Sequence, residues 1–341
     1  MAALGTLELN NIHQGDCVEL LKRIPDNSVD LIFADPPYNL QLNGDLFRPD
    51  TSKVDAVDDE WDKFDSFAEY DRFTNQWLAE CHRVLKPTGS IWVIGSYHNI
   101  FRVGTALQNI GFWILNDIIW VKTNPMPNFK GTRFNNAHET LIWATKSQSS
   151  KFTFHYHSMK VMNDDLQMRS DWVIPICQGN ERIKVNGMKA HSTQKPEELL
   201  YRVLISSSNP GDIVLDPFSG SGTTAAVAKR LGRNYIAFER DEFYISVARE
   251  RLEKITTVQK EMTGYPIENR IPKVPFNSLI VKDYVRVGER LYSKDGTISA
   301  VVNADGTLVS NGFVGSIHKV SAHVLKKSNN NGWSFWYVKR D

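Results

Sequence analysis

The 341-residue sequence has few cysteines and no long apolar segment. Its three cysteines, Cys17, Cys81 and Cys177, are too scattered for a disulfide framework or for a cysteine-based metal site. No run approaches the roughly 18 apolar residues that a membrane-spanning helix needs. Residues 1–11 lack the basic and apolar parts of a secretory signal. These absences predict a cytoplasmic protein that needs neither a membrane nor a metal.

An excess of charge of one sign is also lacking, because 40 Lys and Arg nearly balance 39 Asp and Glu. The balance is uneven along the chain, since residues 270–341 contain 11 Lys and Arg and only 5 Asp and Glu. A basic C-terminal region on a slightly acidic body favours a polyanionic partner such as nucleic acid. A solvated surface that happens to be basic is the alternative interpretation.

Strand and helix patterns alternate over most of the chain. Short apolar runs such as "SVDLIF" (28–33) and "DIVLD" (212–216) read as strands. Segments with helical apolar spacing lie between them, such as "FAEYDRFTNQWLAECHRVLK" (67–86), which we expect to stop at Pro87–Gly89. The alternation predicts an α/β domain with a mostly parallel sheet over residues 1–258.

This alternation is interrupted twice and then ends. Two less regular insertions span about 40–63 and 122–190, and within the second "KFTFHYHS" alternates like a further strand. Residues 259–277 are punctuated by prolines and read as a linker. Residues 278–341 carry two Asp-Gly steps typical of hairpins, which predicts a small β-rich domain.

A glycine-rich turn follows one strand at "DPFSGSGTT" (216–224). Gly220 and Gly222 let a ligand approach the backbone, and the next helix begins with unpaired N–H groups. The turn lacks the lysine of a Walker A loop and does not match G-x-G-x-x-G. Glu239, at the end of the next strand, is placed to hold ribose hydroxyls. A nucleoside cofactor such as S-adenosylmethionine fits; a plain βα turn with a surface acid is the alternative.

An unusual corner follows another strand at "ADPPYN" (34–39). Two consecutive prolines fix two φ angles and remove two N–H donors, so the carbonyls around them are rigid and lack local partners. Such a corner suits a site that accepts hydrogen bonds from a ligand. An irregular turn is the alternative for the motif taken alone.

Together the two motifs resemble the amino-methyltransferases that act on nucleic acid bases. "DPPY" at 35–38 precedes "DPFSGSGTT", and this order is similar to that of the β class of DNA amino-methyltransferases. The basic tail, ending "NNNGWSFWYVKR", resembles the extra domain of the bacterial cell-cycle-regulated DNA adenine methyltransferases. Further matching segments are "GDC" (15–17), "KTNPMPNFKGTRFNNAHETLIWATK" (122–146) and "HSTQKP" (191–196).

The resemblance implies a Rossmann-like S-adenosylmethionine-dependent methyltransferase sheet with a small β-rich C-terminal domain. It also implies transfer of a methyl group to the 6-amino group of adenine in double-stranded DNA, within GANTC, by a homodimer near the nucleoid. The implied cofactor-binding residues are Asp16, Cys17, Asp35, Gln194, Lys195, Asp216, Phe218, Ser219, Gly220, Ser221, Gly222, Thr223 and Glu239.

The physics of the acidic corner supports the same chemistry. An adenine amine is a poor nucleophile, because its lone pair is delocalised into the ring. Acceptors at the Asp35 carboxylate and the Pro36 carbonyl would favour a more pyramidal nitrogen and stabilise the positive charge that develops on it. Tyr38 could stack on a base flipped out of the duplex. Asp35, Pro36, Pro37 and Tyr38 are therefore the predicted catalytic residues.

Candidate DNA-binding residues lie in the second insertion and in the tail. Cations would hold phosphates, amides would read base edges and aromatic rings would stack on bases. Burial of the tail aromatics in the core of a small β domain, and solvation of the basic loop, are the alternatives. The candidates are Lys122, Asn124, Lys130, Arg133, Asn330, Asn331, Trp333, Lys339 and Arg340.

Other activities remain open from the residues. Methylation of a cytosine amine or of an RNA base is the nearest alternative, since Asp35 favours adenine only modestly. A glutamine methyltransferase of the "NPPY" kind, or a DNA-binding module that has lost its activity, fits less well. His155 and His157 could share a strand face, but without neighbouring acids or cysteines they do not predict a metal site.

Overall fold

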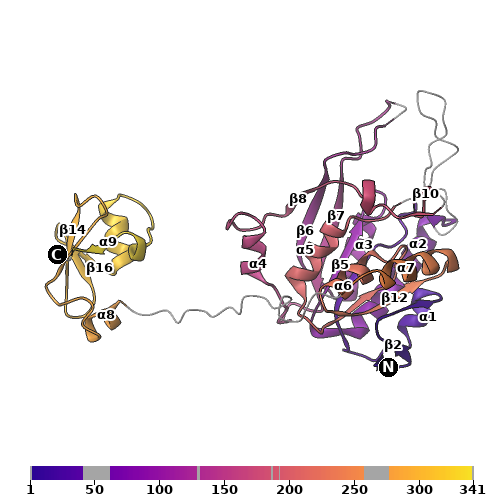
Figure 1. Cartoon of the computed structure of the whole chain (residues 1–341), viewed down its shortest axis with the longest axis horizontal. Coiled ribbons are helices and arrows are strands. Elements are labelled where there is room, and N and C mark those ends of the chain that lie inside the picture. The colour runs from indigo at the N-terminus through magenta and orange to yellow at the C-terminus, as the bar shows by residue number, and fades with distance from the viewer. Residues whose placement is uncertain are drawn as a thin grey trace. The chain divides into compact units, whose positions relative to one another are not determined.

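A computed structural model of the chain describes residues 2–40, 62–128, 131–185, 187–191, 193–256 and 276–339. The chain divides into two compact units, Met1–Ile267 and Glu268–Asp341 (Figure 1). None of the described helices is long and apolar enough to cross a membrane. The described residues also contain no group of three or more His, Cys, Asp and Glu side chains that could hold a metal ion.

The first unit is built on a mixed eight-stranded sheet in which only β7 runs against the others. This arrangement confirms the predicted α/β fold with a mostly parallel sheet. In spatial order the strands are β3 (Asn11–Gln14), β12 (Asn234–Glu239), β11 (Ile213–Asp216), β4 (Val29–Ala34), β5 (Leu85–Gly95), β7 (His138–Thr145), β6 (Trp113–Lys122) and β8 (Asp171–Ile174).

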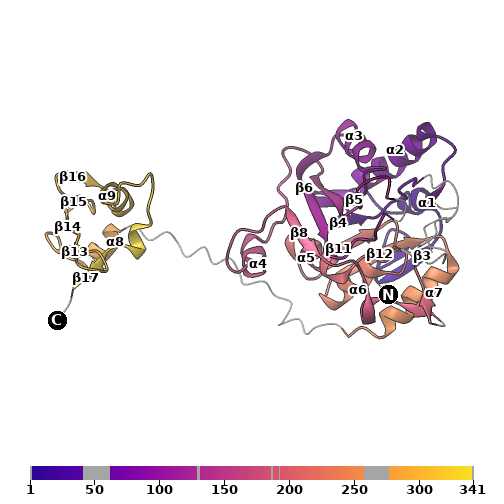
Figure 2. The same ribbon diagram turned by 90° about the horizontal axis from the view of Figure 1, so that it is seen from above.

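Helices cover both faces of this sheet (Figure 2). Side chains of β4 alternate between the two layers: Leu31 and Phe33 join one buried cluster, whereas Ile32 and Ala34 join the other. The first cluster is completed by α5 (Glu197–Ser207), α6 (Thr223–Arg230) and α7 (Glu242–Glu253), and the second by α1 (Cys17–Leu21), α2 (Phe67–Val84) and α3 (Ile100–Ile110).

Two local expectations are wrong. The segment "KFTFHYHS" forms no strand; its second half begins the short helix α4 (Tyr156–Val161), because His155 turns away from extended geometry at φ −88° and ψ 74°. Helix α2 ends at Val84, and β5 then includes Pro87 and Gly89. The strand tolerates them because the pairing of β4 with β5 jumps from Leu85 to Ser90, so these residues lie in an irregularity of the ladder.

Two small hairpins complete the first unit: β1 (Ala3–Leu4) with β2 (Leu7–Glu8), and β9 (Lys184–Val185) with β10 (Met188–Lys189). A 3₁₀ turn covers Gly179–Glu181. Most of the first predicted insertion (about 40–63) lies outside the described residues, which omit 41–61, and so does most of the predicted linker (259–277), because residues 257–275 are not described.

The second unit has a five-stranded antiparallel sheet, as expected for a β-rich domain. Gly296 and Gly306, at φ 73° and 81°, form the two predicted hairpin turns. Helix α9 (Ile317–Val324) packs on the sheet and was not predicted. The remaining elements are α8 (Asn277–Val281), β13 (Arg290–Tyr292), β14 (Ser299–Val302), β15 (Leu308–Ser310), β16 (Phe313–Gly315), a 3₁₀ turn (Gly332–Ser334) and β17 (Tyr337–Val338).

Candidate active site

The sheet brings the acidic corner (Asp35–Tyr38) and the glycine turn (Asp216–Gly222) to the same edge. Asp35 directly follows β4 and Asp216 ends β11. These strands are parallel neighbours, with Ile32 opposite Leu215. Because carboxyl ends of parallel strands meet at one edge, where ligands of open α/β sheets bind, two motifs about 180 residues apart become adjacent.

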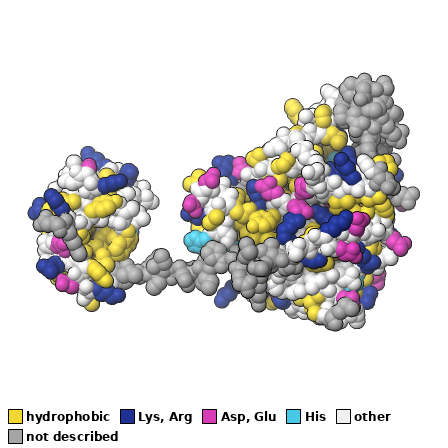
Figure 3. Space-filling view, in the orientation of Figure 1, with side chains coloured by type: hydrophobic (Ala, Val, Ile, Leu, Met, Phe, Trp, Pro, Cys, Tyr) yellow, Lys and Arg dark blue, Asp and Glu magenta, His cyan; other side chains and the backbone are white. Residues whose placement is uncertain are grey.

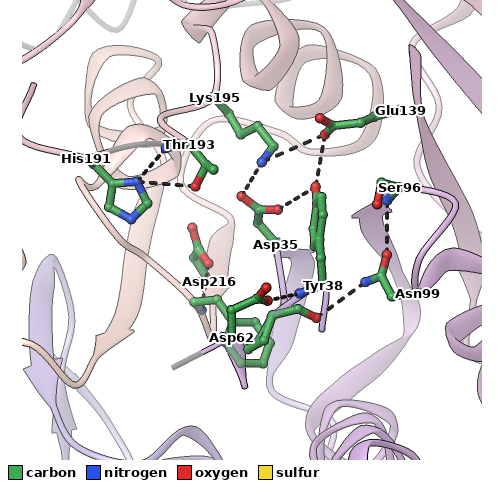
Figure 4. A network of polar contacts seen from close by, with 12 residues as sticks. Asp35, Tyr38, Asp62, Ser96, Asn99, Glu139, His191, Thr193, Lys195 and Asp216 are labelled. Carbon is green, nitrogen blue, oxygen red and sulfur yellow. Dashed lines mark hydrogen bonds and ion pairs between the residues drawn. The ribbon is translucent and has the colours of Figure 1, made fainter. Parts of the chain in front are cut away.

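The Asp35 carboxylate is held by side chains from distant elements (Figure 4). Lys195 donates to its Oδ2 at 2.7 Å, and the Tyr38 hydroxyl lies 3.0 Å from its Oδ1. The same hydroxyl lies 2.9 Å from Oε2 of Glu139. Burial raises the pKa of Asp35 above its ordinary value, although the Lys195 ammonium opposes this shift. Asp35 is therefore a carboxylate with enhanced affinity for a proton or an N–H donor.

The backbone of the corner is fixed from outside as well. Asp62 accepts hydrogen bonds from the three successive N–H groups of Tyr38, Asn39 and Leu40. The Pro37 carbonyl accepts from the Tyr70 hydroxyl at 2.9 Å. Since the Pro37 carbonyl already has a partner within the chain, the Pro36 carbonyl is the better candidate for receiving a hydrogen bond from a ligand.

The glycine turn has a backbone that other residues would strain. Gly220 and Gly222 have φ values of 50° and 74°, in the left-handed region. A Cβ on Gly222 would lie 2.8 Å from Cβ of Ala248, so α7 also requires glycine there. The Gly220 N–H donates to Oε2 of Glu239 at 2.8 Å. Glu239 thus ties the end of β12 to the turn.

Two features of this turn fit a nucleoside cofactor. The Ser219 hydroxyl is buried and has no hydrogen-bond partner among the described residues, so it is available to a ligand. The glycines leave the backbone open to close approach. Asp216 lies beneath the turn, where its carboxylate accepts the Phe218 N–H at 2.9 Å and burial raises its pKa to about 7.

One segment links the turn to the corner. The His191 ring lies against the turn, with Nε2 3.0 Å from where a Gly220 Cβ would be. Four residues later, Lys195 reaches Asp35. Burial lowers the pKa of His191 to about 4, so its imidazole is neutral near pH 7. His191 therefore contacts the glycine turn, and Lys195 contacts the acidic corner.

Other predicted cofactor residues serve local structure. Asp16 caps α1, accepting from the N–H groups of Val18 and Glu19. Gln194 bonds the backbone of Glu181 and Ile183 through its buried amide. Cys17 is buried at the start of α1. Within the turn, Phe218 packs edge-on against Trp77, and the Ser221 carbonyl accepts from Arg251, as does the hydroxyl of Thr223 at the start of α6.

The predicted DNA-binding residues of the first unit differ in their surroundings. Lys122 lies at the end of β6 with an 11% exposed side chain, and its ammonium binds Glu139 at 2.7 Å. Asn124 donates to Gln178 at 2.7 Å. Arg133 is exposed and lies over the Tyr97 ring. The structure therefore places Lys122 and Asn124 in contacts within the chain. Lys130 lies outside the described residues.

In the second unit, Trp333 is 46% exposed and Lys339 is exposed. Asn331 caps the 3₁₀ turn by accepting the Trp333 N–H, and Asn330 is half-buried. Trp336, in contrast, is buried in the core of the small domain. On the visible face of this unit, Lys and Arg side chains surround an apolar area (Figure 3). Arg340 lies outside the described residues.

Sequence reasoning missed the residues that support the corner from afar: Asp62, Tyr70, Asn99 and Glu139. Asn99 donates to the Tyr70 hydroxyl at 3.1 Å, which completes the support of Pro37. Glu139 had one available signal, because it lies within the segment 122–146 that resembles the family. Asp62, Tyr70 and Asn99 belong to ordinary helical or polar patterns, and nothing in the sequence around them indicates a role in the site.

Comparisons with known proteins agree with this site. A model of the family described as DNA methylase matches residues 29–250. A second model, described as Restriction Enzyme Adenine Methylase Associated, matches residues 256–341. The chain is similar to the Type II methyltransferase M.HinfI of Haemophilus influenzae, with 55% identity over 98% of this chain and 93% of the relative.

Two further proteins extend the likeness. The Type II methyltransferase M2.MboI of Moraxella bovis is 40% identical over 77% of this chain and 95% of its own length. A crystal structure of the M1.HpyAVI–SAM complex is 28% identical and has a TM-score of 0.53, covering 71% of this chain and 98% of that one.

Fold and site together define a methyltransferase whose methyl donor is S-adenosylmethionine. More particularly, the chain belongs to the DNA methylase family, which includes enzymes that methylate the N6 of adenine and enzymes that methylate the N4 of cytosine.

Proposed function

We propose that the chain methylates the exocyclic 6-amino group of adenine in double-stranded DNA, within GANTC. The observation that carries this proposal is the Asp35 carboxylate, held beside the glycine turn with raised proton affinity. Aspartate at the first position of the motif favours adenine over cytosine. The match of residues 256–341 to a region associated with adenine methylases supports the same choice. The GANTC site rests on the resemblance of the tail and motifs.

The residues of the corner have distinct roles in this reaction. The adenine amine donates its two N–H groups to Asp35 and to the Pro36 carbonyl, and its nitrogen lone pair is directed at the methyl carbon. A nitrogen–carbon bond forms as the carbon–sulfur bond breaks, with that electron pair left on sulfur. Asp35 stabilises the positive charge developing on nitrogen, and the methylated amine then loses one proton to solvent water. Tyr38 stacks on the flipped base.

The cofactor supplies an electrophilic methyl group on a sulfonium when bound. The residues that would hold it are those of the glycine turn, with Glu239 at its ribose and Ser219 as a buried polar contact. Glu239 already accepts three backbone N–H groups, from Gly220, Arg240 and Asp241, which fixes the orientation of its carboxylate. A fixed acceptor loses little further entropy on binding.

DNA binding involves the basic tail in this proposal, and the enzyme acts as a homodimer on DNA in the bacterial cytoplasm. Trp333 and Lys339 are exposed on the second unit and are available to bases and phosphates. Trp336 contributes to the core of that unit instead. In this proposal the exposed Trp333 contacts DNA, whereas the buried Trp336 stabilises the small domain.

A methyl-transfer assay tests the proposed activity. The full chain is incubated with radiolabelled S-adenosylmethionine and a duplex containing one GANTC site, and the DNA is digested to nucleosides. We expect label in N6-methyladenine and none from a duplex in which the GANTC adenine is replaced. Label in N4-methylcytosine would overturn the adenine assignment, and equal labelling of both duplexes would overturn the site.

A second assay tests the tail. The chain is shortened to end near Gln259, and its affinity for the GANTC duplex is measured beside that of the full chain. We expect weaker binding, together with a shallower dependence on salt because phosphate contacts are lost. Cofactor affinity serves as the control for folding of the first unit. Unchanged DNA affinity and salt dependence would remove the tail from the DNA-binding account.

A further inference from the structure

The Tyr38 hydroxyl faces two carboxylates at once. It lies 3.0 Å from Oδ1 of Asp35 and 2.9 Å from Oε2 of Glu139 (Figure 4). A phenol has one proton and can donate it to only one of them at a time. The carboxylate left without that proton faces an oxygen lone pair and requires another donor. The direction of this single O–H therefore decides how Asp35 can be used.

The surroundings of Glu139 keep it charged. Lys122 donates to its Oε1 at 2.7 Å, and Lys195 lies 3.9 Å from its Oε2. Its side chain is 11% exposed, and although burial opposes ionisation, the two lysines lower its pKa below the ordinary value. Asp35 shows the opposite shift, because burial raises its pKa. Glu139 thus stays ionised and accepts hydrogen bonds in that state. The Asp35 carboxylate, in contrast, is stabilised when a further N–H group donates a hydrogen bond to it.

The reversed strand β7 delivers Glu139 to this place. Glu139 is the second residue of β7 and lies opposite Trp120 of β6. Lys122 is two residues further along β6, on the same face of that strand as Trp120, and so reaches the Glu139 carboxylate. Because β7 runs against its neighbours, its beginning lies at the edge where β4 and β5 end.

We propose that Glu139 is a positioning residue for methyl transfer: it accepts the hydrogen bond that the Tyr38 hydroxyl donates and so leaves Oδ1 of Asp35 available to the N–H of the target amine. This inference rests on the proposed methylation of an amine. Without Glu139, the hydroxyl turns to Asp35 and competes with the amine for the same oxygen. Glu139 acts only through Tyr38 and makes no contact with the base in this account.

A double-mutant cycle on the full chain tests the inference. Single-turnover methyl transfer to a GANTC duplex is measured for wild type, Glu139→Gln, Tyr38→Phe and the double variant. Glutamine keeps the size of the side chain but removes its charge, and phenylalanine keeps the stacking ring but removes the hydroxyl. We expect Glu139→Gln to slow the wild-type enzyme about ten- to hundredfold, which corresponds to one hydrogen bond to a charged group.

The deciding measurement is the coupling between Glu139 and Tyr38, which is the difference between the effects of Glu139→Gln on the rate in the two backgrounds. In the Tyr38→Phe background the competing hydroxyl is absent, so Glu139→Gln should change the rate less than about threefold. Equal losses in both backgrounds would show that Glu139 acts independently of Tyr38 and would overturn the inference. A tenfold loss of S-adenosylmethionine affinity in Glu139→Gln would also overturn it, because the residue would then support the fold of the site.

A matched control and a product analysis separate the causes. Asp30 is likewise a carboxylate bound by a lysine at 2.7 Å, on β4 but at the opposite end of the strand, and Asp30→Asn should leave the rate within twofold of wild type. Wild-type reactions are also analysed for methylated bases. Absence of any methylated amine would overturn the proposed function, whereas a labelled amine with no coupling would overturn the role of Glu139 alone.

Discussion

The glycine turn and the acidic corner share one edge of the sheet but are held in different ways. The acids of the turn accept mostly backbone N–H groups from nearby residues, as Glu239 does from Gly220, Arg240 and Asp241. The corner depends on side chains from far along the chain, such as Lys195, which is 160 residues from Asp35. The glycine turn is therefore formed by local backbone geometry, and the acidic corner is held by long-range side-chain contacts.

This difference predicts different responses to substitution. Side-chain deletions around the corner should affect the reaction, even when they are distant in sequence. Substitutions in the turn should affect folding and cofactor affinity through the backbone. Four predictions test this contrast, in order of decreasing expected effect.

Asp35→Ala should abolish methyl transfer while leaving DNA binding nearly intact. Removing a preorganised group that stabilises charge in the transition state costs about 10²–10³ in rate, and Asp35 also accepts from the amine in the proposed reaction. Single-turnover kinetics and a duplex-binding assay measure the two effects. A near wild-type rate would remove Asp35 from the mechanism and with it the contrast between the turn and the corner.

Gly222→Ala should destabilise the first unit by about 2–3 kcal/mol, because it combines left-handed strain with a clash against Ala248. Gly211→Ala is the matched control, since Gly211 has φ 87° but no described residue places an atom within 4 Å of its Cβ position. That variant should show the strain alone, about 1 kcal/mol. Urea unfolding measures both, and equal losses would show that the packing of α7 on the turn adds nothing.

The Asp216 carboxyl should make stability fall as the pH rises through its raised pKa. Because the folded protein holds this proton up to about pH 7 and the unfolded chain releases it near 3.8, folding is favoured at low pH. The loss between pH 5 and 7 is on the order of 2 kcal/mol by linkage. Unfolding of wild type and Asp216→Asn is compared over this range. A pH-independent difference between the two would contradict the shift.

Tyr70→Phe should have the smallest effect, about 1 kcal/mol in stability, together with a lower rate of methyl transfer. The substitution removes the hydroxyl that donates to the Pro37 carbonyl, leaving Asn99 at 3.5 Å as its remaining partner. Tyr201→Phe on α5, where the tyrosine is 39% exposed, should change neither quantity. Loss of stability with an unchanged rate would show that the carbonyls of the corner need no outside support.

Much of the fold could be predicted because its signals are local. The apolar run "SVDLIF" and the helical spacing of residues 67–84 each depend on neighbours in sequence. The helix α4 escaped prediction, because alternation over eight residues was outweighed by the local turn at His155. Pro87 and Gly89 are ordinary signs of a loop, and only the pairing of β4 with β5 shows that the strand continues through them.

The site divides along the same line. The glycine turn, Glu239 and the acidic corner could be identified from motifs, because each is contiguous in sequence. The pairing of Glu139 and Asp62 with the corner could not be predicted, because it depends on strand order and on the contacts of residues 38–40. The motif predicts a cofactor role for Lys195, and only the structure shows that its ammonium binds Asp35. A motif reveals which residue is present, but only tertiary structure reveals its partner.

The reversal of β7 has a consequence for exchanging segments between relatives. Residues 123–137 join β6 to β7, so a segment exchanged at this point ends immediately before His138 and Glu139. A graft that includes these two residues would replace the partner of Tyr38 along with the exchanged segment. Chimaeras whose downstream junction lies before His138 should keep their turnover, and those joined beyond Glu139 should keep it only if the donor loop also supplies a carboxylate there.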